Sequence, residues 1–162
     1  MTLWFMVFSL PVFIKPKYKS FAQVYPTNLQ KYSDESATEQ MLQMLESDII
    51  RKAICEEFNL DSIYDIEEDD PHFKTLLYRE YADNVQFKKT KHESVEIEVL
   101  DNDPERAYSM VNAILARFNI EVKRIQDEKL IEAVGTIKEM MDIKKEEISN
   151  LEIQINKIRK EY

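Results

Sequence analysis

HESVEIEVLDNDPERAYSMVNAIL, residues 92–115, decides the fold of this chain. Val95, Ile97 and Val99 alternate with polar residues, which predicts a strand with one face in a core. Asp103 followed by Pro104 is typical of the N-cap and first residue of a helix. A strand that runs into a capped helix often cradles a phosphate, but such loops need glycines, and the chain's only glycine is Gly135. The junction is therefore predicted to start a helix and not to bind a nucleotide.

Composition narrows the class of protein. A chain of 162 residues suits one domain, with room for an appendage, and its net charge of −9 argues against nucleic acid as a partner. Residues 1–30 hold three lysines and no acid, so the acidic residues all lie in the rest of the chain. Cys55 is the only cysteine, which rules out an internal disulfide and a multi-cysteine metal site.

Residues 1–14, MTLWFMVFSLPVFI, are uncharged and are followed by KPKYK. As a helix they would reach about 21 Å, which is short of a hydrocarbon core of about 30 Å. The lysines follow the apolar run, whereas a signal peptide carries them before it. Apolar residues lie all round such a helix. We expect a partial transmembrane helix at 1–14 that attaches the chain to a membrane, with a core element as the alternative.

Two helices are predicted in the middle of the chain. The first begins at the capping-box pair Ser36 and Glu39 and carries an apolar stripe to just before Asn59, a plausible residue after its C-terminus. The second begins with Asp70 as N-cap and Pro71 as first residue, and ends near residue 83.

Three segments alternate between apolar and polar residues and are predicted strands. They are YKSFAQVY before Pro26, VQFKK at 85–89, and SVEIEVL at 94–100. The last two are separated by TKHE, which predicts an antiparallel hairpin. In that hairpin Lys88 and Lys89 would lie near Glu96 and Glu98, and cross-strand pairs of opposite charge help to fix the register.

A heptad pattern fills the C-terminal fifth of the chain. Steps of four and three connect Leu130, Val134, Ile137, Met141, Lys144, Ile148, Leu151, Ile155, Ile158 and Tyr162. We call these ten positions the seam. Lys144 is its only charged member. With no proline after Pro104, one helix from 104 to 162 would be about 88 Å long. No other predicted element is long enough to cover such a helix, so we expect its seam to pack against partner helices and not against its own small domain.

No segment predicts catalysis. EEDDPH, residues 67–72, lacks the ligand spacing of a calcium loop and is interpreted as a solvated acidic loop. Asp101 and Asp103 match a D-x-D triplet that some sugar-nucleotide enzymes use for a metal, but Asp103 is already explained as a helix cap. His72 and His92 lie in separate loops. We therefore predict a protein that is not an enzyme, with no catalytic, cofactor-binding or metal-binding residues and no cofactor.

Three segments, in this order, resemble the Wzz-type chain-length determinants, the polysaccharide co-polymerases of bacterial inner membranes. They are PKYKSFAQVYP after an apolar end, EQMLQMLESDIIRKAICEEFNL, and SVEIEVLDNDPERAYSMVNAIL. The last segment is the most specific, and the match spans about residues 10–130. The family also has a long helix, but the residues of the long helix predicted here do not match those of the family.

The resemblance implies an α/β (α+β) fold with a small mixed sheet packed by helices as a membrane-proximal base. The expected organisation is a partial transmembrane helix at 1–14, a base domain at 15–115, and an extended coiled-coil-like arm at 116–162 continuous with the base helix from 104. The family pattern also has a second transmembrane helix and a returning helix, which this sequence lacks. We expect the domain to face the periplasm and to form ring-like homo-oligomers. These would set the chain length of O-antigen, capsule or exopolysaccharide together with a polymerase and the growing glycan.

Three alternatives remain open at the level of sequence. The first is the extracytoplasmic portion of a tyrosine autokinase-type polysaccharide exporter, whose cytoplasmic domain would carry a Walker-type phosphate loop. The second is a metal-dependent glycan-processing enzyme that uses Asp101 and Asp103. The third is a generic coiled-coil adaptor.

Overall fold

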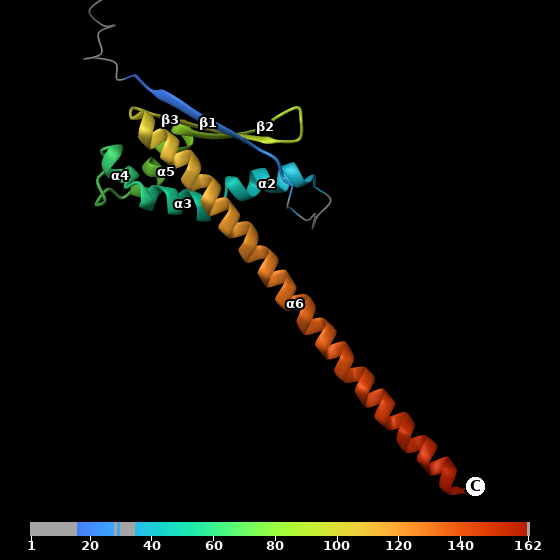
Figure 1. The fold of residues 1–162 in the computed structure, drawn as a ribbon. Helices are drawn as coiled ribbons and strands as arrows, with labels where there is room; N and C mark the ends of the chain where they lie inside the picture. Colours follow the sequence, from blue (N-terminus) through green and yellow to red (C-terminus); the bar gives the residue numbers. More distant parts are fainter. Residues whose placement is uncertain (1–15, 28, 30–34, 162) are drawn as a thin grey trace, which may run out of the picture. The chain divides into compact units, whose positions relative to one another are not determined.

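The computed structural model describes residues 16–27, 29 and 35–161 and has an α+β fold. It divides between Glu121 and Val122 into two compact units. The first unit holds a three-stranded sheet with its helices, and the second is a stretch of one long helix (Figure 1). The expected membrane helix at 1–14 lies outside the described residues.

The sheet is antiparallel throughout and has the order β1-β3-β2 (β1, Tyr18–Val24; β2, Val85–Lys89; β3, Val95–Asp101). In the register of β2 and β3, Lys88 lies opposite Glu96, as the hairpin predicts. β1 pairs with the other edge of β3, so that β3 is the central strand. The resemblance implied a mixed sheet, and this is wrong for the described strands. A two-strand hairpin is antiparallel by construction, and β1 also runs opposite to β3.

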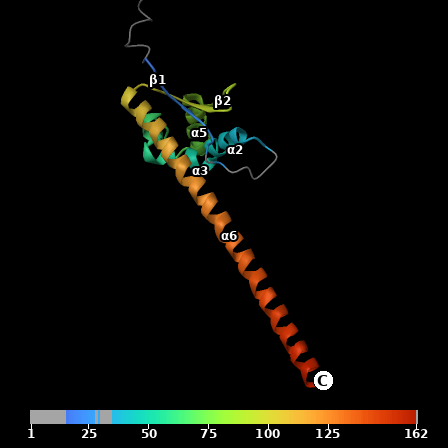
Figure 2. The same ribbon diagram turned by 45° about the vertical axis from the view of Figure 1, so that its right-hand side comes forward.

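The first unit contains four short helices: α2 (Ala37–Leu45), α3 (Asp48–Glu57), α4 (Leu60–Ile63) and α5 (Phe73–Asn84). Helices α2 and α5 pack on β2 and β3, whereas α3 and α4 pack on α5. Figures 1 and 2 show α2, α3 and α5 on the same side of the strands. The core of the first unit is mainly apolar. Its largest fully buried apolar side chains are Met41, Leu45, Ile50, Ile54, Leu60, Val95, Ile97, Val99, Met110 and Ile114, and the polar Thr38 and Gln40 are buried beside them. The predicted inward set of β3 is thus confirmed.

The first predicted helix is two helices. Its capping box is confirmed, because the Ser36 hydroxyl accepts from the Glu39 N–H and the Glu39 carboxylate accepts from the Ser36 N–H. The chain then leaves helical geometry at Ser47, whose extended backbone precedes Asp48 in the first turn of α3. Ser-Asp is itself a helix-start signal, and the apolar stripe hid it. Asn59 adopts the left-handed conformation (φ 48°) between α3 and α4, in line with the predicted C-terminus.

The helix predicted from Pro71 begins two residues later, at Phe73. The Asp70 carboxylate accepts from the His72 N–H at 2.6 Å, and the Asp70 carbonyl accepts from the Phe73 N–H. These bonds form a turn, so the Asp-Pro pair precedes the helix instead of capping it directly.

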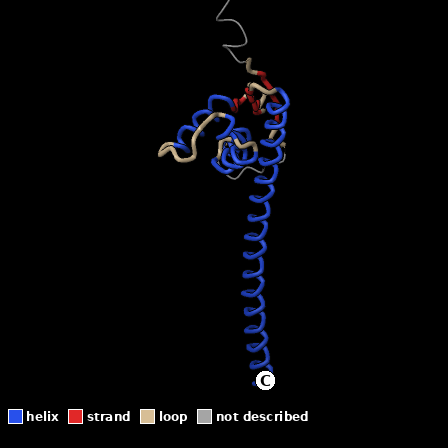
Figure 3. The backbone as a smooth tube through the Cα atoms, turned by 90° about the vertical axis from the view of Figure 1, so that its left-hand side faces the viewer, coloured by secondary structure: helices blue, strands red, loops and turns tan. Residues whose placement is uncertain are grey.

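Helix α6 runs from Pro104 to Glu161, 58 residues without a break (Figure 3). Its first turns belong to the first unit and bury Ala107, Met110, Val111, Ile114 and Phe118. From Lys129 to Lys160 every described side chain is exposed. Among the described residues, none of the helices combines the length and apolarity needed to cross a membrane.

Candidate functional site

The junction between β3 and α6 is built around the carboxylate of Asp101. Asp101 is 5% exposed, and both its oxygens accept from the Arg106 guanidinium, Oδ2 from Nε at 2.8 Å and Oδ1 from Nη2 at 2.5 Å. Oδ1 also accepts from the Asp103 N–H at 2.8 Å. This bidentate pair raises the pKa of Arg106 and ties the end of the strand to the first turns of the helix.

Asp103 caps α6 as predicted. Its Oδ1 accepts from the Glu105 N–H at 2.9 Å and from the Arg106 N–H at 3.5 Å. The two carboxylates of the D-x-D triplet are therefore occupied by protein donors, and this arrangement disfavours a shared metal ion. No group of three or more histidine, cysteine, aspartate or glutamate side chains within the described ranges is arranged to hold a metal.

The outer face of the sheet carries an ion cluster centred on Glu98. Glu98 Oε2 lies 2.7 Å from the Lys19 ammonium on β1 and 3.3 Å from the Lys88 ammonium on β2. The Lys19 bond is the main reason that the pKa of Glu98 lies below its usual value, although desolvation opposes it. The cluster joins all three strands. The hairpin predicted the Lys88 contact, whereas Lys89 instead pairs with Glu39 and Glu93.

The seam is an exposed apolar surface on the isolated chain. Its eight described apolar members are between 51% and 63% exposed. Ile137, Met141, Lys144 and Ile148 border an almost wholly apolar depression together with Met140 and Lys145. Lys144 pairs with Glu147 at 2.6 Å on the same helix. Tyr162, the last seam position, lies outside the described residues. Single apolar residues on a surface are ordinary, but a row along several helical turns marks a surface that a partner covers.

The remaining candidates behave as structural or solvated groups. Cys55 is buried, and burial raises the pKa of its thiol to about 11, far from that of a nucleophile. His72 and His92 are exposed, as are Glu67 to Asp69 of the acidic loop. The structure does not bring these residues together into one site.

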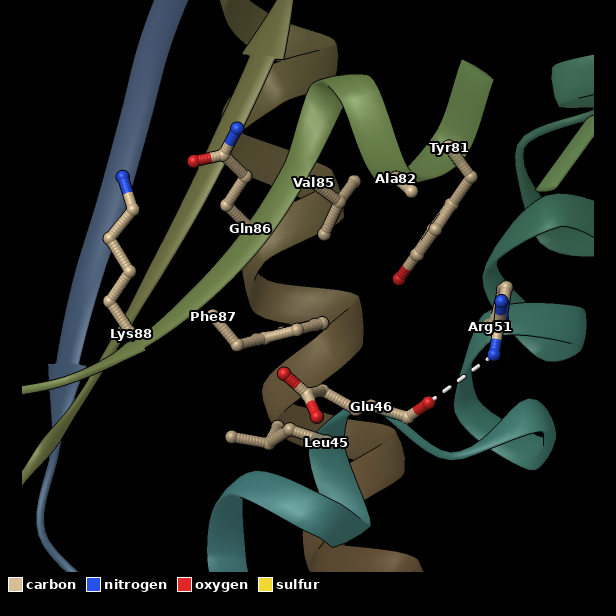
Figure 4. A pocket seen from close by; sticks show the side chains of 9 residues that line it. All are labelled: Leu45, Glu46, Arg51, Tyr81, Ala82, Val85, Gln86, Phe87 and Lys88. Carbon is tan, nitrogen blue, oxygen red and sulfur yellow. Dashed lines mark hydrogen bonds between the residues drawn. The ribbon is translucent and has the colours of Figure 1, made fainter. Parts of the chain in front are cut away.

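One feature has no signal in the sequence. A pocket of about 450 Å³ opens between the end of α5, the α2–α3 turn and β2 (Figure 4). It is lined by Leu45, Glu46, Arg51, Tyr81, Ala82, Val85, Gln86, Phe87 and Lys88. The residues come from four elements and lie up to 43 positions apart, so no local spacing could have indicated them.

Comparison of the chain with family models, with curated proteins and with solved structures finds no match.

Proposed function

We propose that this chain is a non-enzymatic, oligomeric regulator of bacterial surface-polysaccharide chain length. It acts at the inner membrane, faces the periplasm and works with a polymerase and its growing glycan. The assignment to polysaccharides rests on the three sequence segments that resemble the Wzz-type determinants. The architecture is compatible with it, because an α+β unit leads through a capped junction into one long helix.

The observation that carries the proposal is the exposed seam. Burying an apolar side chain of this size contributes roughly 1.5–3 kcal/mol, so eight such positions provide a strong drive for helix association. Four heptads are also enough for a coiled coil. The function follows from the geometry of the assembly and needs no reacting group.

A double substitution tests the proposal. Ile148→Asp with Ile155→Asp removes two apolar contacts from the seam and places charge there. We expect a smaller oligomer by light scattering and an altered glycan length distribution on gels of cell-surface polysaccharide. The control is Asn150→Asp with Asn156→Asp, which adds the same charge to the same turns at positions outside the seam and its flanks.

The two readouts separate the parts of the proposal. Unchanged oligomer size in the seam variant contradicts packing through the seam. A smaller oligomer with an unchanged glycan distribution contradicts the link to polysaccharide length and leaves a coiled-coil adaptor.

A further inference from the structure

The pocket of Figure 4 lies along one edge of the sheet, that of β2. β2 is the last strand in the order β1-β3-β2, and no described strand pairs with its outer side. Four consecutive residues of β2, from Val85 to Lys88, line the pocket. Successive side chains of a strand point to opposite faces, so a pocket on a face would be lined by alternate residues only. In Figure 4 the Gln86 and Lys88 side chains point away from the pocket. Gln86 and Lys88 therefore line the pocket with their backbone atoms and not with their side chains.

The direction of the backbone groups follows from the hairpin register. The Thr90 N–H donates to the Ser94 carbonyl at 2.8 Å, which makes this a hydrogen-bonded pair of the antiparallel ladder. Such pairs alternate, so Lys88 and Gln86 also bond to β3. Phe87, between them, directs its N–H and C=O outward. The Val85 N–H fits this alternation, because it donates to Tyr81 on α5 and not to β3.

The wall opposite this edge carries polar groups with unused hydrogen-bonding capacity. Tyr81 is 4% exposed, and its hydroxyl has no partner among the described residues. In Figure 4 that hydroxyl points into the space between Phe87 and Arg51. Buried hydroxyls are normally bonded, so an unbonded one on a residue that lines a pocket is suited to bond a ligand group.

Arg51 is held in place beside this hydroxyl. Its guanidinium stacks over the Tyr78 ring at 4.9 Å, and Nη2 donates to Asp48 at 2.6 Å and to the Glu46 carbonyl at 3.4 Å. Nε and Nη1 make no hydrogen bond within the part of the chain that the structure describes. A fixed guanidinium with free donors next to a phenol suits a carboxylate. The Glu46 carboxylate, also at the pocket, would repel an anion placed near Leu45, so the carboxylate belongs at the Arg51 end.

We propose that this pocket binds an extended peptide segment of a partner protein as a fourth strand. The segment pairs with the Phe87 edge and sets an Asp or Glu side chain against Arg51 and Tyr81. A second copy of this chain does not supply that segment through either of its edge strands, because neither β1 nor β2 contains an acidic residue.

The test uses synthetic six-residue peptides of alternating valine and threonine, with glutamate at each position in turn. We expect the best of them to bind the full chain by fluorescence anisotropy and to slow hydrogen exchange of the Phe87 amide. The same peptide with glutamine should bind roughly tenfold more weakly. A version N-methylated on its pairing edge should not bind.

Two protein variants locate the site. The Arg51→Gln variant should bind the glutamate peptide and the glutamine peptide equally. Both peptides are measured on the same variant, so a change in its folding affects both alike. Tyr81→Phe should weaken peptide binding while leaving thermal stability unchanged or higher, because it removes an unbonded hydroxyl. The absence of binding by every peptide at millimolar concentration overturns the proposal. Two other outcomes also overturn it. In one, the N-methylated peptide binds as tightly as the unmodified peptide. In the other, benzoate displaces the peptide when both are present at the same concentration.

Discussion

Asp101 is the residue on which the start of α6 depends. It joins the last position of β3 to the first turn of the helix through Arg106, and it also orders the Asp103 backbone. Because the Asp101 carboxylate is almost fully buried, its ion pair with Arg106 contributes to the fold and is not a solvent-exposed surface pair. The D-x-D pattern in the sequence has a structural cause here, a buried ion pair followed by a cap.

We predict that Asp101→Asn destabilises the fold by about 2–3 kcal/mol, because the buried position then lacks its charge and the partly buried Arg106 loses its counter-charge. Asp103→Asn should change stability little, since asparagine caps helices as well as aspartate does. Urea unfolding followed by circular dichroism measures both. If instead a divalent cation raises the melting temperature of the wild type and not of Asp101→Asn, the metal-dependent alternative is supported.

A second prediction at the scale of residues concerns Glu98 and the loss of folding stability in acid. Its pKa is lower in the folded state than in the unfolded chain, chiefly because of Lys19. Its contribution is therefore fully present above the unfolded value of about 4.3 and is lost as pH falls through the folded-state pKa. Glu98→Gln should be less stable than the wild type at neutral pH and equal to it at lower pH. Glu96→Gln is the control, because Glu96 makes no ion pair with described residues. A constant difference between the Glu98 variant and the wild type at every pH would contradict this account.

At the scale of elements, the two serine-led helix starts are not equivalent. Ser36 forms a complete capping box, whereas the Ser47 hydroxyl is buried and has no partner among the described residues. Ser36→Ala should therefore cost about 1 kcal/mol, and Ser47→Ala should be neutral or stabilising. Thermal unfolding of the two variants compares them directly. Equal losses would mean that the Ser47 hydroxyl is bonded in solution.

The elements also show where prediction from sequence succeeds. β3, the cap at Asp103 and the long helix were predicted, because alternation, an Asp-Pro start and a heptad are local patterns. The break at Ser47 was missed because an apolar stripe continues through it. The antiparallel direction of β1 and the pocket beside β2 depend on contacts between distant segments, so the sequence pattern contains no signal for them.

At the scale of the whole molecule, the two units differ in where their apolar residues lie. The first buries them between sheet and helices, whereas the second leaves them exposed along the seam. A surface of this kind ties stability to protein concentration, since association stabilises only the folded chain. On our proposal the second unit therefore depends on assembly for its stability.

Lys144 is the place to test that dependence. It is the only charged residue in the seam and is paired within its own helix, and a polar residue at a core position of a coiled coil lowers stability while restricting register. We predict that Lys144→Leu strengthens self-association and raises the melting temperature, with a steeper dependence on concentration than in the wild type. Lys157→Leu adds the same apolar volume between three and four helical turns further on, outside the seam, and should leave the concentration dependence unchanged. Analytical ultracentrifugation and thermal unfolding over a hundredfold range of concentration distinguish the two. If Lys157→Leu has the same effect as Lys144→Leu, nonspecific hydrophobic association of the helix drives self-association, and packing at the seam does not.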